Sequence, residues 1–400
     1  MPFRPLRRRA FLRQSGGALA LSALPLPLRA MADPAAPAAL LDPEVSGQPM
    51  PQLLQPLPDP PDRRVGFALV GLGAYALNQI APNLANTQHA RLAALVSGNA
   101  DKAREVARAY GVGERHVYSY DSFDRIAEDE TVDVVYVVLP NAFHREWTER
   151  AFAAGKHVLC EKPMAETVED CEAMIAAGER AGKRLMIGYR AQFDPYNLRA
   201  IDLVRNGEIG DVKLLSTEHG RPLDLSRPRD QWRARGELAS GGSLYDIGIY
   251  SVNGARYLTG EEPVEVTARY RPGSGRPEVT VEEGVEWTLL FPSGAVASSA
   301  SSYLVASANR MTVEGTDGEV TLDPATDYYV RTLVHIRGDR RTEIVVPQAN
   351  QFARMLDEMA LAAREDRPPK TPGEEGLRDV RVMQAIYRAA ETGETVRLGN

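Results

Sequence analysis

The 400-residue chain is 44% hydrophobic and 25% charged, which is typical of a globular protein of two or three domains. Residues 1–32 hold six arginines and no acidic residue, so the overall net charge of −7 becomes −13 without them, from 41 basic and 54 acidic residues. A body this acidic repels phosphate backbones, which argues against nucleic-acid binding. No apolar run reaches the roughly 20 residues that span a bilayer, so membrane insertion is not expected. Two cysteines exclude a disulfide scaffold and a multi-cysteine zinc site.

Residues 1–32 have the three parts of an export signal in order. The stretch RRAFLR at residues 8–13 is similar to the twin-arginine consensus, and a weakly apolar stretch follows from Ser15 to Leu28. The tripeptide AMA at residues 30–32 is a typical cleavage site, which predicts a mature start at Asp33. We therefore expect the twin-arginine export machinery to carry the folded chain to the periplasm. A basic, unstructured tail is the alternative.

The next segment, residues 33–63, is a proline-rich arm. Residues 33–62 hold nine of the 28 prolines and no periodic apolar face. Such a run favours the extended polyproline II conformation, with a reach of roughly 3.1 Å per residue. It is either a spacer or a strap across the body or a neighbouring subunit.

A dinucleotide-binding pattern begins at residue 64. The apolar run Val65–Val70 predicts a buried parallel strand, and GLGAYA at residues 71–76 follows it. This is the G-x-G-x-x-G/A fingerprint, in which the first glycine permits a tight turn and the second admits the pyrophosphate. We expect Gly71, Gly73, Ala74 and Tyr75 to contact the nucleotide.

The alternation of strands and helices supports that interpretation. Further apolar strands are predicted at Leu92–Val96, Val132–Leu139, His157–Cys160 and Arg184–Ile187. Helical patterns at Asp101–Tyr110, His144–Ala154 and Val168–Ala181 lie between most of them. This order predicts a doubly wound parallel sheet, a Rossmann domain over residues 64–188.

The end of the second strand favours NADP over NAD. In NAD enzymes an Asp or Glu at this point binds the ribose 2′-hydroxyl. Here Ser97 and Gly98 occupy the position, and Lys102 lies one turn into the next helix. A hydroxyl and an ammonium can bind the 2′-phosphate that a carboxylate would repel. Asp101 is the alternative acid, but it better suits the first turn of the helix.

Two further motifs are candidates for the chemistry. Lys162 follows the strand His157–Cys160, at the carboxyl end of the sheet where ligands bind. Asp246 and Tyr250 are spaced i and i+4, so on a helix they share one face. The alternatives are a surface lysine and a buried core tyrosine. The histidines show no metal-ligand spacing, so no metal is expected.

Taken together, these stretches resemble the glucose–fructose oxidoreductase / inositol dehydrogenase / rhizopine-catabolism (Gfo/Idh/MocA) family, and most closely its glucose–fructose oxidoreductase branch. The motifs that carry the resemblance are GLGAYALNQ (71–79), LVSGN (95–99), LPN with His144 (139–144), AGKHVLCEKPM (154–164), LMIGYR (185–190), QWRARGEL (231–238), GGSLYDIGIY (241–250) and PGEEGLRD (372–379).

The resemblance implies roles for individual residues. Lys162 orients substrate and cofactor, Asp246 hydrogen-bonds the sugar, Tyr250 is the acid–base residue, and Arg190 lies near the sugar pocket. Ser97 and Lys102 match contacts to the 2′-phosphate. Other positions match the nucleotide lining of the branch: Tyr120, Leu139, Pro140, Asn141, His144, Glu161, Trp232 and Arg233.

The proposed base needs a lowered pKa. Free tyrosine titrates near 10, too high for an efficient base at neutral pH. We expect the nearby ammonium of Lys162 to stabilise the Tyr250 phenolate.

Residues 189–400 predict an α+β domain on a large, mainly antiparallel open sheet. Period-two strands are expected at Lys213–Thr217, Val264–Tyr270, Val285–Phe291, Arg310–Val313 and Ile344–Val346, and helices at Gln351–Ala363 and Glu375–Thr392. One face would cover the active site, and the other could pair subunits. The resemblance implies a homodimer or homotetramer.

The sequence therefore predicts an exported sugar oxidoreductase with tightly bound NADP. It would oxidise an aldose such as glucose to its lactone and reduce a second sugar, fructose or an aldose, with the same cofactor. One alternative is a simple aldose dehydrogenase that releases NADPH. Another is a non-catalytic nucleotide- or sugar-binding protein on the same fold.

Overall fold

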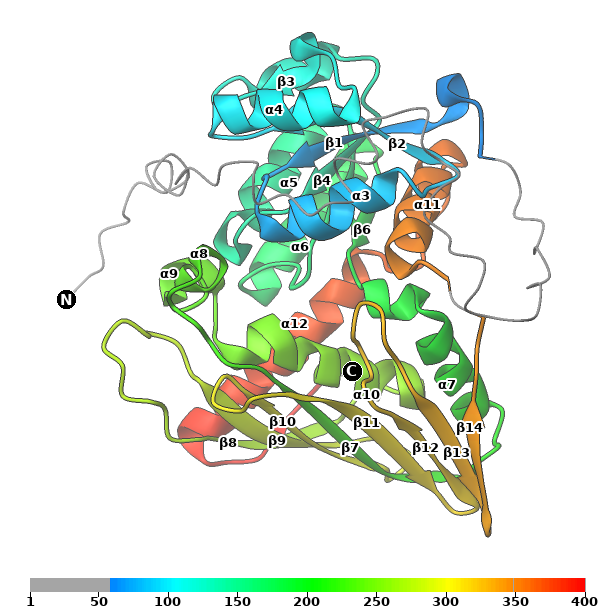
Figure 1. Cartoon of the computed structure of the whole chain (residues 1–400). Coiled ribbons are helices and arrows are strands. Elements are labelled where there is room, and N and C mark those ends of the chain that lie inside the picture. Colours follow the sequence, from blue (N-terminus) through cyan, green and yellow to red (C-terminus); the bar gives the residue numbers. More distant parts are fainter. Residues whose placement is uncertain (1–57, 348, 400) are drawn as a thin grey trace.

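A computed structural model describes residues 58–347 and 349–399 (Figure 1). The predicted export signal and residues 33–57 of the proline-rich arm lie outside the described residues. Within the described part, one sheet lies in the upper half of Figure 1 and the other in the lower half, with helices between them, and the last strand of the first sheet ends at Ile187.

The first sheet is parallel throughout, with the strand order β3-β2-β1-β4-β5-β6. Its strands are β1 (Val65–Val70), β2 (Ala90–Val96), β3 (Val117–Tyr118), β4 (Val134–Val137), β5 (His157–Cys160) and β6 (Leu185–Ile187). Every residue of β1 is buried, because helices cover both faces of the sheet. This is the strand order of a doubly wound dinucleotide-binding domain, and the predicted fold class is confirmed.

The helical connections of this sheet follow the predicted pattern closely. They include a π-helical segment η3 (Ala76–Ile80), α3 (Ala81–Leu84), α4 (Ala100–Tyr110), α5 (His144–Ala153) and α6 (Val168–Ala181), with short 3₁₀ turns η4 (Glu114–His116), η5 (Phe123–Glu128) and η6 (Asn141–Phe143). Asn99 and Thr167 cap α4 and α6, and Gly111 and Gly182 end them in the left-handed conformation.

The second sheet has nine strands in the order β14-β13-β12-β11-β7-β10-β9-β8-β15. All neighbours are antiparallel except β7 and β10. The strands are β7 (Val212–Gly220), β8 (Glu265–Tyr270), β9 (Gly284–Leu290), β10 (Val296–Ser302), β11 (Ala308–Gly315), β12 (Gly318–Leu322), β13 (Leu333–Arg337), β14 (Arg340–Ile344) and β15 (Val396–Arg397). The predicted strand at Ile344–Val346 is wrong, because β14 ends at Ile344 and Val345 is exposed.

Helices cover only one face of the second sheet (Figure 1). They are η7 (Arg190–Phe193), α7 (Pro195–Arg205), the π-helical segment η8 (Leu244–Gly248), α10 (Ile249–Thr259) and α12 (Gly373–Thr392), with two short helices, α8 (Pro228–Gln231) and α9 (Gly236–Ala239), in the loop after β7. Because α12 packs against both β8 and α6, it joins the two domains.

One helix returns to the first domain. Although α11 (Gln351–Arg364) follows β14 of the second sheet in the chain, its apolar face packs against β1 and β2 of the first. Phe352, Met355 and Leu356 are buried there beside Phe67 and Leu69. The chain therefore crosses the domain boundary more than once, and these crossings fix the space between the sheets.

Candidate active site

The glycine-rich loop after β1 leaves room for a ligand. Gly71 has φ +93°, and a Cβ at this position would lie 2.3 Å from the Val138 carbonyl oxygen, so only glycine fits. A Cβ at Gly73 would meet nothing within 4 Å, and Gly73 and Ala74 are exposed. Packing within the protein thus does not require the second glycine, whereas close approach of a pyrophosphate does. This loop fits a dinucleotide.

The turn after β2 presents neutral and basic side chains and, among its described residues, no inward-facing carboxylate. The Ser97 hydroxyl accepts a hydrogen bond from the Asn99 N–H (3.1 Å), and Asn99 caps α4 by accepting from the Lys102 N–H (3.0 Å). Asp101 is exposed and pairs with Arg104, so its carboxylate points to solvent. Burial lowers the pKa of Lys102. Among the described residues no carboxylate forms an ion pair with Lys102, and the turn fits a 2′-phosphate better than a ribose hydroxyl.

Tyr120 borders the same turn. Its hydroxyl contacts the backbone of Gly98, and its ring packs edge-on against Trp147 with centroids 5.0 Å apart. Burial raises the pKa of Tyr120 to about 12, so its hydroxyl stays protonated. It can act as a neutral wall of the nucleotide site.

Lys162 extends from the end of β5 toward the helices of the second domain. Its Nζ donates to the main-chain oxygen of Asp246 (2.7 Å) and lies 4.5 Å from the centroid of the Tyr250 ring. Burial lowers the pKa of the ammonium, while the Asp246 charge opposes that shift. The structure therefore brings together Lys162, Asp246 and Tyr250, which lie up to 88 positions apart in the sequence.

The stronger cationic influence on Tyr250 comes from Arg190. The guanidinium carbon lies 5.0 Å from the centroid of the tyrosine ring. Burial raises the pKa of Tyr250, and the charge and hydrogen bonding of Arg190 are the main effects that oppose it. Lys162 lies close to Tyr250 as expected, but the sequence did not reveal that Arg190 would be the main cation that lowers the pKa of Tyr250.

Arg190 is held rigidly from two loops. Its Nη1 donates to Gln351 Oε1 (2.9 Å) and its Nη2 to the Thr326 main-chain oxygen (2.7 Å), and the residue is 3% exposed. Both terminal nitrogens of Arg190 are bound within the protein, and its predicted place near the sugar pocket stays a prediction. The side chain faces Tyr250.

His219 completes the surroundings of Tyr250. Its ring nitrogens contact the hydroxyls of Ser251 (2.8 Å) and Thr326 (3.0 Å), and its ring centroid lies 5.6 Å from that of Tyr250. Burial lowers the pKa of His219 to about 3, so it stays neutral. It supports the tyrosine ring without adding charge.

Asp246 lies on the π-helical turn η8 rather than on a regular α-helix. Its carboxylate accepts from Arg233 Nε (2.9 Å) and from Arg221 Nη2 (2.8 Å). Burial alone would raise the pKa of Asp246, but the two arginines hold it far below its usual range. The sequence associated Arg233 with the nucleotide; the structure shows that it binds Asp246 and stacks on Trp232 (4.3 Å).

Two residues assigned to the nucleotide make polar contacts within the protein. His144 is fully buried, and its ring nitrogens lie 2.8 Å from the Pro163 oxygen and 2.9 Å from the Leu139 oxygen. The Glu161 carboxyl is buried against the Tyr136 hydroxyl, beneath the sheet edge. The polar atoms of both side chains thus have partners within the protein, and the predicted place of the two residues in the nucleotide lining stays a prediction.

The remaining predicted lining residues lie at the junction of the domains. Leu139 packs beside Gly71, and Pro140 precedes the turn η6. The Asn141 side-chain amide donates to the Ala239 oxygen (2.6 Å), which ties the first domain to α9. This bond closes the loop after β7 over the same edge of the sheet.

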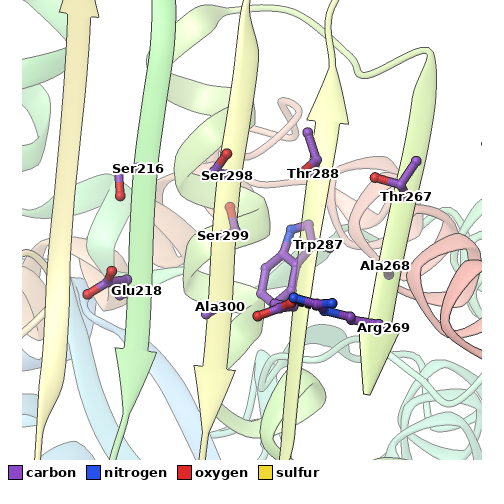
Figure 2. A pocket seen from close by; sticks show the side chains of 11 residues that line it. Ser216, Glu218, Thr267, Ala268, Arg269, Trp287, Thr288, Ser298, Ser299 and Ala300 are labelled. Atoms are coloured by element: carbon purple, nitrogen blue, oxygen red, sulfur yellow. Dashed lines mark hydrogen bonds and ion pairs between the residues drawn. The ribbon is translucent and has the colours of Figure 1, made fainter. Parts of the chain in front are cut away.

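A shallow hollow on the opposite, uncovered face of the second sheet is separate from this site (Figure 2). Ser216, Glu218, Ser298 and Thr288 lie along it. On β7 these residues alternate with the buried Thr217 and His219, whose side chains point toward α10.

Within residues 58–347 and 349–399, no cluster of histidine, cysteine, aspartate and glutamate side chains has the arrangement of a metal site. In the same part of the chain, no helix combines the length and hydropathy that a membrane span needs.

Family models match most of the chain. The Gfo/Idh/MocA oxidoreductase family matches with its NAD-binding Rossmann fold over residues 65–189 and with its C-terminal α/β domain over residues 201–398.

Several relatives have recorded activities or solved structures. The structure of an aldose–aldose oxidoreductase from Caulobacter crescentus, complexed with glycerol, is 49% identical and superposes with a TM-score of 0.81, covering 84% of this chain and 100% of that one. A D-xylose 1-dehydrogenase [NADP(+)] from Haloarcula marismortui is 32% identical over 84% of this chain and 94% of its own. A 3-ketoreductase from Actinomadura kijaniata, solved with TDP-benzene and NADP, is 25% identical with a TM-score of 0.73, covering 82% of this chain and 98% of that one.

Proposed function

This chain belongs to the Gfo/Idh/MocA oxidoreductase family, and we propose that it is an NADP-dependent sugar oxidoreductase that retains one cofactor through two half-reactions. It oxidises an aldose such as glucose to its lactone. It then reduces a second sugar, fructose or another aldose, to the alditol. The similarity to an aldose–aldose oxidoreductase at 49% identity supports the paired reaction.

The observation that carries the proposal is the meeting of Lys162, Asp246 and Tyr250 beside the glycine loop. Lys162 projects from the carboxyl end of β5, the edge of the sheet where ligands bind in doubly wound folds. Its contacts with the Asp246 oxygen and the Tyr250 ring bring a proton-transfer group and a hydrogen-bond acceptor to the same place.

NADP fits the first domain. The exposed Gly73 and Ala74 backbone would hold its pyrophosphate, and Ser97 and Lys102 would hold its 2′-phosphate. Bound there, NADP would supply the hydride chemistry of both half-reactions, as acceptor for the aldose C1 and as donor, once reduced, for the carbonyl carbon of the second sugar.

Tyr250 is the acid–base residue. In the oxidation half-reaction its phenolate takes the proton of the C1 hydroxyl, and in the reduction half-reaction its phenol donates a proton to the new alkoxide. The cations of Arg190 and Lys162, both near the Tyr250 ring, stabilise the phenolate. Asp246, ionised at any working pH, accepts hydrogen bonds from sugar hydroxyls and orients the reacting carbon.

Export supports retention of the cofactor. The RRAFLR segment at residues 8–13 and the AMA site at residues 30–32 favour twin-arginine export of a folded protein to the periplasm. An enzyme outside the cytoplasm cannot depend on a soluble NADP pool, whereas a retained cofactor regenerated by a second sugar removes that dependence. Replacing both Arg8 and Arg9 with lysine should leave the precursor in the cytoplasmic fraction.

A simple aldose dehydrogenase that releases NADPH is the second candidate. The D-xylose 1-dehydrogenase relatives, 32% and 29% identical, favour it. The two functions differ in one measurable property, the fate of the reduced cofactor.

The decisive experiment is a spectrum of the mature chain purified without added nucleotide. Glucose should generate a bound reduced-nicotinamide absorbance near 340 nm, and fructose or a second aldose should then remove it. Absence of any co-purifying nucleotide, together with free NADPH release during turnover, would favour the simple dehydrogenase.

We also propose that the chain forms a homo-oligomer through the uncovered face of the second sheet. The residues along the hollow on this face are mostly small or hydroxylated. Leu214, on strand β7, is 52% exposed. Sedimentation of the wild type and of Ser298→Arg should separate a dimer or tetramer from a monomer.

A further inference from the structure

The sugar side of the site contains a row of alternating charges, Asp230–Arg221–Asp246–Arg233. Arg221 Nη1 and Nη2 donate to the two oxygens of Asp230, both at 3.0 Å, and Nη2 also donates to Asp246 Oδ2 at 2.8 Å. Arg233 Nε donates to the other oxygen, Asp246 Oδ1, at 2.9 Å. Arg221 thus joins Asp246 to Asp230, and both Arg221 and Asp230 lie in the segment after β7.

Asp230 fixes the arginine from within the protein. The Asp230 side chain is 1% exposed, and Asp224 N–H also donates to it (3.2 Å). A carboxylate this deeply buried is stable only when it is paired and hydrogen-bonded, and the two-pronged arginine contact supplies both. Arg221 also donates to the Pro222 oxygen (3.0 Å) and lies over the Tyr303 ring (5.3 Å). Its guanidinium is therefore held in one orientation.

This arrangement leaves the Asp246 carboxylate able to accept further hydrogen bonds. Each carboxylate oxygen receives one arginine N–H, so each keeps lone-pair capacity for another donor. The Asp246 side chain is 15% exposed, which gives a ligand access to it. Two adjacent oxygens, each able to accept one more hydrogen bond, match two neighbouring hydroxyl groups.

We infer that Arg221 and Asp230 are a positioning pair, which holds Asp246 as a fixed acceptor for two adjacent hydroxyls of a neutral sugar. The inference rests on the proposed function. It also specifies a neutral sugar as the substrate class. The terminal nitrogens of Arg221 are already hydrogen-bonded within the protein, so a carboxylate on the sugar would find no free donor there and would be repelled by Asp246.

The same pair sets the position of the sugar relative to the proton-transfer group. The main-chain oxygen of Asp246 accepts from Lys162, and Tyr250 lies four residues further along the helix. A carboxylate held by Arg221 therefore has a fixed position relative to Lys162 and Tyr250. Without Arg221 only the Arg233 contact would restrain the Asp246 carboxylate, while its backbone stayed in place.

The test measures sugar binding without turnover. Enzyme loaded with NADPH is titrated with sorbitol, which cannot be oxidised by a reduced cofactor, and nicotinamide fluorescence reports binding. Arg221→Met should weaken sorbitol binding by about tenfold or more, because a charged hydrogen bond that orients the acceptor is lost. Asp230→Asn should weaken it less, and Arg221→Lys should restore only part of the affinity, since lysine cannot make the forked contact. NADPH affinity should stay within about twofold in all variants.

A double-mutant cycle separates positioning from a general structural role. In an Asp246→Asn background, Arg221→Met should add little further loss. The matched control is Arg227→Met, an arginine of the same loop that is 59% exposed and pairs with Asp224; it should bind sorbitol as the wild type does.

Three results would overturn the inference: no binding of sorbitol to the wild type, unchanged affinity in Arg221→Met, or equal loss in both backgrounds. If the wild type binds sorbitol but turns over no aldose, the proposed function fails while the positioning pair stands.

Discussion

Replacing Arg190 with methionine should raise the pH at which the enzyme begins to oxidise sugars. Methionine fills a similar volume but removes the cation beside Tyr250. Burial already raises the pKa of Tyr250, and Arg190 is the main group that opposes it. The variant therefore loses the stabilisation of the phenolate, and the base form appears only at higher pH.

The size of the effect follows from the geometry. The guanidinium carbon lies 5.0 Å from the Tyr250 ring centroid, and at an effective dielectric constant of about 20 a unit charge at that distance contributes about 3 kcal/mol. Losing that stabilisation of the phenolate raises the pKa of Tyr250 further. Other groups face the same ring or its hydroxyl, namely Lys162, His219, Glu161, Asp246, Tyr75 and Tyr328. All of these groups remain in the variant, so the change in the pH profile reports the loss of the arginine charge alone.

The assay is the pH dependence of the single-turnover rate of bound NADP reduction by glucose. The rising limb of the profile should move to higher pH in Arg190→Met and should change much less in Arg190→Lys, which keeps a positive charge. Methionine leaves the Gln351 and Thr326 acceptors without a donor, so some loss of thermal stability is expected in addition. A lower rate with an unshifted profile would refute the electrostatic role and leave Arg190 as a structural residue.

Three further predictions test other parts of the structure. Tyr250→Phe should lower the rate constant of sugar oxidation by about 10²- to 10⁴-fold while NADP stays bound; full activity would remove Tyr250 from the mechanism. Ser97→Asp should weaken NADP relative to NAD by about tenfold or more, because a carboxylate repels the 2′-phosphate; unchanged preference in competition titrations would contradict that assignment. Burial alone would raise the pKa of Asp129, but hydrogen bonds from Thr131, His116 and Tyr118 lower it to about 2. About 2 kcal/mol of stability should therefore be present above pH 4 and be lost as the pH falls toward 2; the unfolding free energy of Asp129→Asn should lack this component, and a constant difference from the wild type across that range would contradict it.

The sequence predicted the first domain well because its signals are local. Neighbouring residues alone determine the continuous apolar runs, the Gly71–Gly73 turn and the helix caps. The observed bounds of β5 and α6 are the same as the predicted ones. The second sheet was harder to predict. Strand β10 reads VASSASS, in which Val296 is the one β-branched residue and no residue is aromatic, so its composition does not indicate a strand. It forms because β7 and β9 pair with it on both sides.

The motifs located the site but did not distinguish its working residues from its supports. His144 and Glu161 belong to the motifs, yet both are buried with their polar atoms facing the protein. Arg221 and Asp230 belong to none of the quoted motifs, and they meet because the chain turns back into α8 directly after β7. Burial and pairing depend on tertiary structure, which residue spacing does not report.

The site is assembled from both domains, and Asp246 links them. Its main-chain oxygen accepts from Lys162 of the first domain, while its carboxylate accepts from Arg221 and Arg233 of the second. The residue lies on a π-helical turn, a feature that often occurs at functional sites and widens the helix locally. The backbone of Asp246 thus binds the cation of the first domain, and its side chain binds the two cations of the second. Because the same turn continues into α10 and Tyr250, any shift of one domain against the other would move the lysine away from both the acceptor and the base. The packing of α11 and α12 across the domain boundary therefore restrains the position of Lys162 relative to Asp246 and Tyr250.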